Sequence, residues 1–234
     1  MPNYCYNVVR APKEVLDDLY KNKKITFEKL IPMPKSLNLT EGSRTENAVL
    51  YAVLKKDFET RSKLIKVLSN VHEYIDHNYW NKLVNRFALG TPNGLLKAME
   101  KLDREAKVFC PDEDERKLKI NSLEELGNTY LNNLLKYKSM TWYDWCINNW
   151  GTKWDAFECE GSPEEEELRF TTAWSPPEKV IVKLFTKHSD KKIEWEYETE
   201  GDSERGIYFS DEKGNIKLKK TEIERKEEED EEEI

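Results

Sequence analysis

The 234-residue sequence has few of the residues that cross-link a chain or interrupt its secondary structure, with four cysteines, nine glycines and nine prolines. Cys5, Cys110, Cys146 and Cys159 show no C-x-x-C pair, and the three histidines are not spaced as metal ligands. A zinc site needs about four clustered ligands, so we predict neither a metal nor a cofactor. Buried free thiols in a reducing cytosol are the expected state of the cysteines.

Long apolar runs are also missing. No stretch approaches the roughly 20 apolar residues that a membrane-spanning helix needs, and the N-terminus lacks the basic and apolar regions of a secretory signal. We therefore expect a cytoplasmic protein without membrane association. Aromatic residues, by contrast, make up 11% of the chain and include seven tryptophans, which argues against global disorder.

The net charge of −8 is concentrated towards the C-terminus. Residues 158–234 hold 13 basic and 25 acidic side chains, whereas residues 1–56 hold 10 and 6. The acidic run 227–233 predicts a disordered tail over 221–234. An acidic surface repels phosphate, so direct nucleic-acid binding is disfavoured. Such a surface suits a partner with a basic groove, although a solvated tail is the simpler interpretation.

The middle of the chain has the 3.6-residue apolar period of helices. Apolar stripes lie at 58–71, 80–87, 95–102 and 126–135, and a capping box at Ser122 opens the last of them. We predict a helical domain over 57–140, inserted into an outer domain made of residues 1–56 and 141–220. Residues 35–47 are predicted to be loop.

The outer domain alternates as strands do. Alternation occurs at 3–9, 154–159, 168–174, 193–197 and 216–218, and proline-led helices follow Pro12 and Ser175. The strands are apolar on one side only, which is typical of an antiparallel sheet with helices packed on one face. The predicted fold class is therefore α+β, a ferredoxin-like sheet with an inserted helical block.

The other side of the predicted sheet is rich in glutamate. It carries Glu158, Glu160, Arg169, Thr171, Ala173, Glu194, Glu196 and Glu198. Small domains of this shape that bind RNA stack bases on exposed aromatic residues flanked by basic ones. Recognition of RNA on this face is therefore disfavoured.

Four stretches together carry a family resemblance: residues 1–7, 27–34, 142–156 and 170–177. The most specific part is Trp-Cys-x-x-x-Trp-Gly-Thr-Lys-Trp, from Trp145 to Trp154. The set resembles the YubB-type ferredoxin-like domain family, which occurs in phage, plasmid and insect-symbiont phage proteins and has no assigned activity. The resemblance covers roughly residues 1–34 and 141–210. The resemblance implies a ferredoxin-like fold and a location in the cytoplasm of a bacterial host cell. The family has no known catalytic residues that could be assigned to positions in this sequence.

Two groups of residues in the helical block are candidate partner contacts. The first mixes aromatic residues with imidazoles between two helices, and tyrosine and tryptophan dominate binding hot spots: His72, Tyr74, His77, Tyr79 and Trp80. The second is basic and spaced near one helical turn: Lys97, Lys101 and Arg104. A structural connector and a solvated helix face are the alternative interpretations.

The tryptophan-rich motif is interpreted as core, because indoles bring a large apolar area: Trp142, Trp145, Cys146, Trp150, Trp154 and Trp174. A ligand platform is the alternative. Asp144 and Asp155 together offer two carboxylates for acid–base catalysis, but Asp144 is better explained as a helix cap. A thiolate at Cys146 would need a histidine in reach, so a buried helical thiol is favoured.

No catalytic residues are assigned, and we predict a binding protein rather than an enzyme. Given the mobile-element habitat of the resembled family, the specific expectation is a counter-defence inhibitor, for example an anti-CRISPR. It would bind and block a host protein or ribonucleoprotein immune effector. The alternative is an enzyme or ligand-binding protein that acts on nucleotides or nucleic acid through a pocket near the Trp-rich helix.

Overall fold

The computed structural model describes residues 3–40, 43–70, 97, 100–101, 113–200, 204–211 and 213–222. The chain divides into two compact units. Unit 1 joins the two ends of the chain, Met1–Pro32 and Cys146–Ile234, and unit 2 is the intervening stretch, Met33–Trp145. Unit 2 begins at residue 33 rather than at the expected residue 57, because a helix within residues 33–56 belongs to its core.

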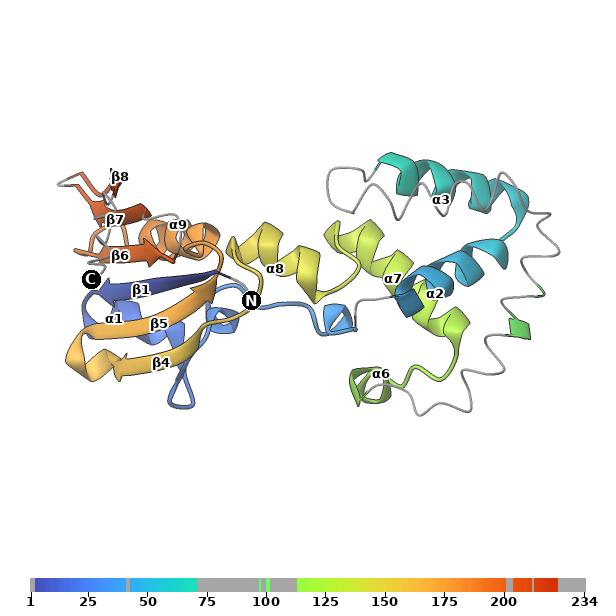
Figure 1. Cartoon of the computed structure of the whole chain (residues 1–234), viewed down its shortest axis with the longest axis horizontal. Coiled ribbons are helices and arrows are strands. Elements are labelled where there is room, and N and C mark those ends of the chain that lie inside the picture. The colour runs from blue at the N-terminus through green and yellow to red at the C-terminus, as the bar shows by residue number, and fades with distance from the viewer. Residues whose placement is uncertain are drawn as a thin grey trace, which may run out of the picture. The chain divides into compact units, whose positions relative to one another are not determined.

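Unit 1 contains a six-stranded antiparallel sheet whose order, β4-β5-β1-β6-β7-β8, can be followed from bottom to top in Figure 1. The strands are β1 (Tyr4–Arg10), β4 (Phe157–Ser162), β5 (Glu167–Ala173), β6 (Glu194–Thr199), β7 (Glu204–Ser210) and β8 (Ile216–Glu222). β1 occupies the middle, and Val9 lies opposite Leu168 of β5 and Trp195 of β6. The N-terminal strand is therefore completed by strands from the other end of the chain.

One face of this sheet is buried, as the one-sided alternation predicts. Cys5, Leu168 and Trp195 are fully buried at positions of β1, β5 and β6 that share a face. Two helices, α1 (Lys13–Leu16) and α9 (Glu178–Lys187), bury their own apolar stripes and lie behind the sheet in Figure 1. The predicted α+β architecture, an antiparallel sheet with helices on one face, is confirmed.

A chain of aromatic rings runs through the core of unit 1. Trp195 meets Phe170 edge to face at 5.6 Å between ring centroids, Phe170 meets Phe27 at 5.7 Å, and Phe27 meets Trp150 at 5.7 Å. The Trp150 indole also donates to the Ile31 carbonyl at 2.9 Å. These contacts explain why the proline-broken segment at 27–34 is ordered, since Phe27 anchors it in the core.

Short elements complete unit 1. A separate two-stranded hairpin pairs β2 (Tyr20–Lys21) with β3 (Lys24–Ile25), and neither strand is long enough to show a period in the sequence. Three 3₁₀ turns accompany it: Asp17–Leu19, Phe27–Lys29 and Pro163–Glu165. α8 (Trp142–Trp150) spans the boundary between the two units.

Unit 2 is helical where it is described. Its elements are a 3₁₀ turn at Lys35–Leu37, α2 (Ser43–Leu54), α3 (Phe58–Asn70), α6 (Glu113–Lys117) and α7 (Leu123–Tyr137). The capping box that opens α7 forms as expected, with the Glu125 amide donating to Ser122 Oγ at 3.1 Å. No helix in the described part of the chain is long and apolar enough to cross a membrane.

The loop predicted at 35–47 is wrong from residue 43 onwards, where α2 begins. Every residue from Ala48 to Leu54 is buried, so α2 is apolar around most of its circumference. A helix buried on all sides has no polar face, and its sequence therefore lacks the one-sided stripe that marks a surface helix.

Candidate functional site

The face of the sheet that points away from the buried core is the candidate site, and we call it the open face. Strand register places its side chains in rows across the sheet. One row joins Arg169, Val8, Glu196 and Ile207, and the next joins Glu167, Arg10, Glu194 and Phe209. Tyr6 and Phe209 are large exposed apolar side chains on this face, with 48% and 37% of their surface accessible.

Charge divides the open face into two parts. Over β4, β5, β1 and β6, and over the turn that precedes β5, glutamates outnumber arginines; we call this part the acidic half-face. Eight glutamates lie there, namely Glu158, Glu160, Glu165, Glu166, Glu167, Glu194, Glu196 and Glu198, with Arg10 and Arg169 among them. Over β7 and β8 the charged open-face side chains are basic: Arg205, Lys217 and Lys219.

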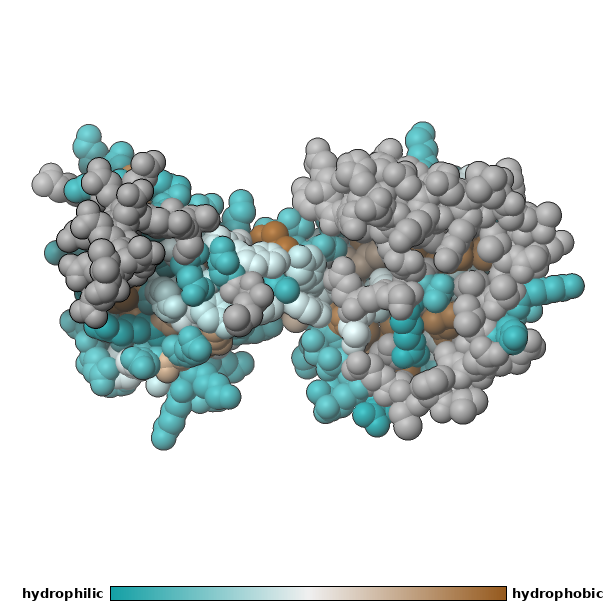
Figure 2. Space-filling model, in the orientation of Figure 1, coloured by the Kyte–Doolittle hydropathy of each residue, from teal (hydrophilic) through white to brown (hydrophobic). Residues whose placement is uncertain are grey.

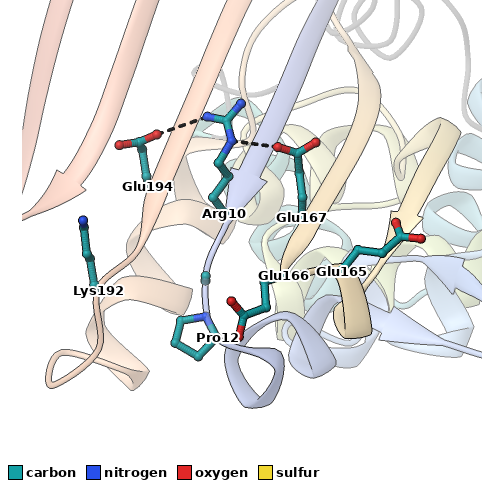
Figure 3. Close-up of a pocket in the computed structure, with 8 residues that line it drawn as sticks. Arg10, Pro12, Glu165, Glu166, Glu167, Lys192 and Glu194 are labelled. Carbon is teal, nitrogen blue, oxygen red and sulfur yellow. Dashed lines mark hydrogen bonds and ion pairs between the residues drawn. The ribbon is translucent and has the colours of Figure 1, made fainter.

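Arg10 organises the centre of the acidic half-face. Its Nε lies 2.7 Å from a Glu167 oxygen, and its Nη1 lies 3.1 Å from Glu194 and 2.7 Å from Glu196. Figure 3 shows the guanidinium between Glu194 and Glu167. The hydrogen bond to Glu196 raises the pKa of Arg10 above its ordinary value, so this cation is permanent. Hydrogen bonds from Arg169 and Arg10 together outweigh desolvation and lower the pKa of Glu167.

Two shallow hollows lie in the acidic half-face. The first, of about 500 Å³, lies beside Arg10 and is lined also by Pro12, Glu165, Glu166 and Lys192 (Figure 3). The second, of about 310 Å³, lies beside Tyr6 and is lined by carboxylates of β4 together with Arg169. In Figure 2 the visible surface over β4, β5 and β1 is mostly hydrophilic with small apolar areas.

Replacing Arg10 by alanine is expected to lower the stability of unit 1 at pH 7. Three carboxylates lose a shared cation, and because Arg10 is partly exposed the loss should be about 1 kcal/mol. The pKa of Glu167 is depressed in the folded protein, so its contribution is present above the ordinary pKa of 4.5 and is lost as the pH falls through the lower folded value. The difference between wild type and R10A should therefore shrink below about pH 4.

Urea unfolding of both proteins between pH 3 and pH 7 measures this difference. Arg205→Ala is the matched control, because Arg205 is more exposed and pairs only with Glu198 among the described residues. It should cost clearly less than R10A. An R10A penalty that stays constant from pH 7 to pH 3 would contradict the role of the carboxylates.

The structure describes only two of the eight candidate contacts in the helical block. His72, Tyr74, His77, Tyr79, Trp80 and Arg104 lie outside the described residues. Lys97 and Lys101 are helical and exposed, as expected for one helix face. The assignment of these groups as partner contacts stays a prediction.

The tryptophan-rich motif is only partly core. Trp145, Cys146 and Trp150 are buried, whereas Trp142 and Trp154 are half-buried. The core interpretation is wrong for Trp174, which is 41% exposed and adopts a left-handed backbone with φ +73°. The reason is local: Lys153 Nζ lies 4.8 Å from the Trp154 ring centroid and 5.0 Å from that of Trp174, so the two indoles flank a cation.

Asp155 has structural hydrogen-bond partners, and the Cys146 thiol is buried. Asp155 accepts hydrogen bonds from the Phe27 amide at 2.7 Å and from Thr26 Oγ1 at 2.6 Å, which ties the 26–27 segment to the start of β4, and burial raises its pKa. Asp144 lies within the first turn of α8. Burial raises the pKa of the Cys146 thiol to about 12, which leaves it protonated at neutral pH.

Among the described residues, one histidine has a charged partner and no group of side chains forms a metal site. His188 Nε2 lies 2.7 Å from Asp18, which Lys187 also approaches at 2.6 Å. Within the ranges that the structure describes, no three histidine, cysteine, aspartate or glutamate side chains are grouped as ligands for a metal ion.

Sequence reasoning found Arg169 and five of the eight glutamates of the open face. It missed Arg10, the aromatic residues and the glutamates at 165–167. β1 has apolar side chains on both sides, Cys5 and Val9 on one and Tyr6 and Val8 on the other, so its pattern does not tell which side is exposed. The position of Arg10 among three glutamates depends on strand register, which the sequence does not show. Thr171 and Ala173 were expected on the exposed side, but both are buried.

Comparison with known proteins supports the fold. Residues 149–234 match the model of a family described as a ferredoxin-like domain in Api92-like protein. The crystal structure of protein api92 from Yersinia pseudotuberculosis is similar over 94% of this chain and 98% of that chain, with 11% sequence identity and a TM-score of 0.41. No curated protein matches the sequence. The match to the family model confirms a ferredoxin-like domain in the C-terminal part of unit 1, while the YubB-type affiliation and the mobile-element habitat stay predictions.

Proposed function

We propose that this chain is a non-catalytic binding protein that docks a partner protein on the acidic half-face. The observation that carries the proposal is the set of eight glutamates held on a sheet face that no described helix of unit 1 covers. Tyr6, at the centre of this face, supplies an exposed aromatic side chain of the kind that anchors interfaces.

The carboxylates are held in place before any partner arrives. Arg10 fixes three of them, Arg169 holds Glu167 at 2.7 Å, and Thr171 donates to Glu158 at 3.1 Å. Side chains that are already ordered lose little conformational entropy on binding, which favours affinity. The remaining negative charge steers a positively charged surface towards the face and raises the association rate.

The chemistry of the partner follows from this charge. A protein surface rich in lysine and arginine, with room for an aromatic side chain, complements the acidic half-face, and nucleic-acid-binding grooves have that composition. Our specific proposal is a counter-defence inhibitor that occupies the nucleic-acid groove of a host immune effector in the bacterial cytoplasm. Its support is the charge of the face and the mobile-element habitat implied by the family resemblance.

The test uses the full chain and a partner purified from the host. Affinity purification at low salt should recover one stoichiometric protein, which should then lose its bound fluorescent DNA or RNA oligonucleotide when the chain is added. The variant E160K/E165K/E166K reverses three exposed charges that make no ion pair with any described residue. It should bind the purified partner at least tenfold more weakly, because like charges would then face each other.

The matched control is E59K/E113K/D190K, which makes the same change of charge at exposed positions that do not belong to the open face. It should bind within about twofold of wild type, since surface pairs of this kind contribute little. Recovery of no stoichiometric partner, or equal binding by both triple variants, would refute docking on the acidic half-face.

A further inference from the structure

The β2–β3 hairpin carries a concentrated positive charge on a two-residue turn. Its tip residues, Asn22 and Lys23, both have left-handed backbone, with φ of 52° and 62°. That geometry matches the twist of a tight hairpin, but it normally takes glycine at the second position. A lysine there costs about 1 kcal/mol relative to glycine. Lys21 and Lys24 lie directly opposite each other across the ladder, and like charges so placed repel.

The hairpin is firmly rooted despite these costs. The Thr26 amide donates to the Leu19 carbonyl at 2.8 Å, and Ile25 is buried at 3% exposure. Lys29 Nζ donates to the backbone carbonyls of Asp17 and Tyr20 at the base of the hairpin. The tip therefore projects from a fixed base (Figure 1) and presents its charges in a defined direction.

Three lysines at this tip lack a partner among the described residues. Lys21, Lys23 and Lys24 are exposed, and none makes a hydrogen bond or ion pair through its ammonium with a described residue. Some other lysines of unit 1 are paired, for example Lys187 with Asp18 at 2.6 Å and Lys220 with Glu204 at 2.8 Å. The unfavourable turn and the facing lysines weaken the hairpin, which points to a contact outside the molecule.

The same chain carries a complementary surface. Glu160, Glu165 and Glu166 of the acidic half-face are exposed and likewise unpaired among the described residues. The last two line the 500 Å³ hollow beside Arg10. Three lysines and three glutamates without a partner among the described residues are thus present on every copy, and no hydrogen bond or ion pair joins the two sets within one molecule.

We propose that the β2–β3 hairpin of one copy binds the acidic half-face of a second copy. The contact joins two different surfaces, so association is head to tail and closes into a ring or continues as a chain. Both copies carry a charge of −8, but at about 0.1 M salt the screening length is about 10 Å. Long-range repulsion is then damped while ion pairs in direct contact persist. The inference does not depend on the proposed function.

Sedimentation velocity of the full chain at 0.1 M salt tests the proposal. The wild-type sedimentation coefficient should rise with concentration from a few micromolar to a few hundred micromolar, and the rise should disappear at 0.5 M salt. K21E/K23E/K24E and E165K/E166K should each weaken self-association at least tenfold. An equimolar mixture of these two variants should associate again, because each charge set then meets its opposite on the other variant.

K179E/K183E/K213E is the matched control, because it reverses three exposed lysines on α9 and the β7–β8 turn and should associate as wild type does. Circular dichroism should show that all variants are folded. A wild type whose sedimentation is independent of concentration, or a hairpin variant that still associates, would overturn the proposal. So would a monomeric wild type that binds a short DNA duplex through the three lysines, since the hairpin would then recognise phosphate.

Discussion

Replacing Gly127 with leucine is expected to unfold unit 2. Gly127 lies in α7 where it crosses α2, and a Cβ atom at this position would meet the Ala48 carbonyl oxygen at 1.9 Å and Ala52 Cβ at 2.7 Å. The first of these atoms is backbone, so the overlap can be relieved only by moving the two helices apart. Their contact buries Leu50, Leu126 and Tyr130. Overpacking of a close helix crossing should cost about 3 kcal/mol or more.

Hydrogen exchange measured by mass spectrometry on α2 and α7 peptides reports this directly, and G127L should lose most of the protection there. Gly127→Ala should show a smaller loss of protection, because the gain in helix propensity offsets about 1 kcal/mol of the destabilisation caused by the overlap. Asn132→Ala, at an exposed position of α7, is the control and should leave protection unchanged or slightly raised. Protection in G127L equal to that of wild type would show that the two helices do not cross as described.

Truncation of Trp195 to alanine should destabilise unit 1 by about 3–5 kcal/mol. The side chain is fully buried on β6, packs edge to face on Phe170 at 5.6 Å, and lies opposite Val9 and Tyr208 on the two neighbouring strands. Its indole donates to Asn7 Oδ1 at 3.1 Å. Alanine would leave both a large cavity and a buried acceptor without its donor, and both effects act in the same direction.

Urea unfolding followed by far-ultraviolet circular dichroism measures this loss, with Trp195→Phe as the informative comparison. Phenylalanine keeps a ring against Phe170 and removes the hydrogen bond, so W195F should lose about 1–2 kcal/mol, between wild type and W195A. Asn7 keeps its other contacts, with Nδ2 donating to Thr172 Oγ1 at 3.0 Å. A W195A penalty below about 1 kcal/mol would exclude Trp195 from the centre of the core.

The sheet could be predicted in outline because apolar residues recur at every second position on several of its strands. Leu168 and Phe170 on β5, and Trp195 and Tyr197 on β6, repeat with the period of two that marks such strands. β7 was not foreseen, because Ile207, Tyr208 and Phe209 are consecutive apolar residues on both of its sides. α2 was not predicted for a similar reason: a helix that is buried on all sides has no one-sided apolar stripe in its sequence.

The candidate site was predictable only in its composition. Alternation placed Glu194 and Glu196 on the exposed side, and the structure has them there. Arg10 lies at the end of a strand whose sequence neighbours show no acidic residue to pair with it; its partners lie more than 150 positions away in the chain. Ion-pair networks across strands depend on register, and register is a property of the assembled sheet.

The central position of β1 has a consequence for synthesis in the cell. Asn7 is joined to Thr172, 165 positions later, and to Trp195, 188 positions later. At about 5–20 residues per second, a ribosome needs roughly 8–30 s to make the stretch between the first two. During that interval β1 has emerged while its sheet neighbours do not yet exist. Completion of unit 1 is therefore a late event in translation, and newly made chains carry an unsatisfied strand for several seconds.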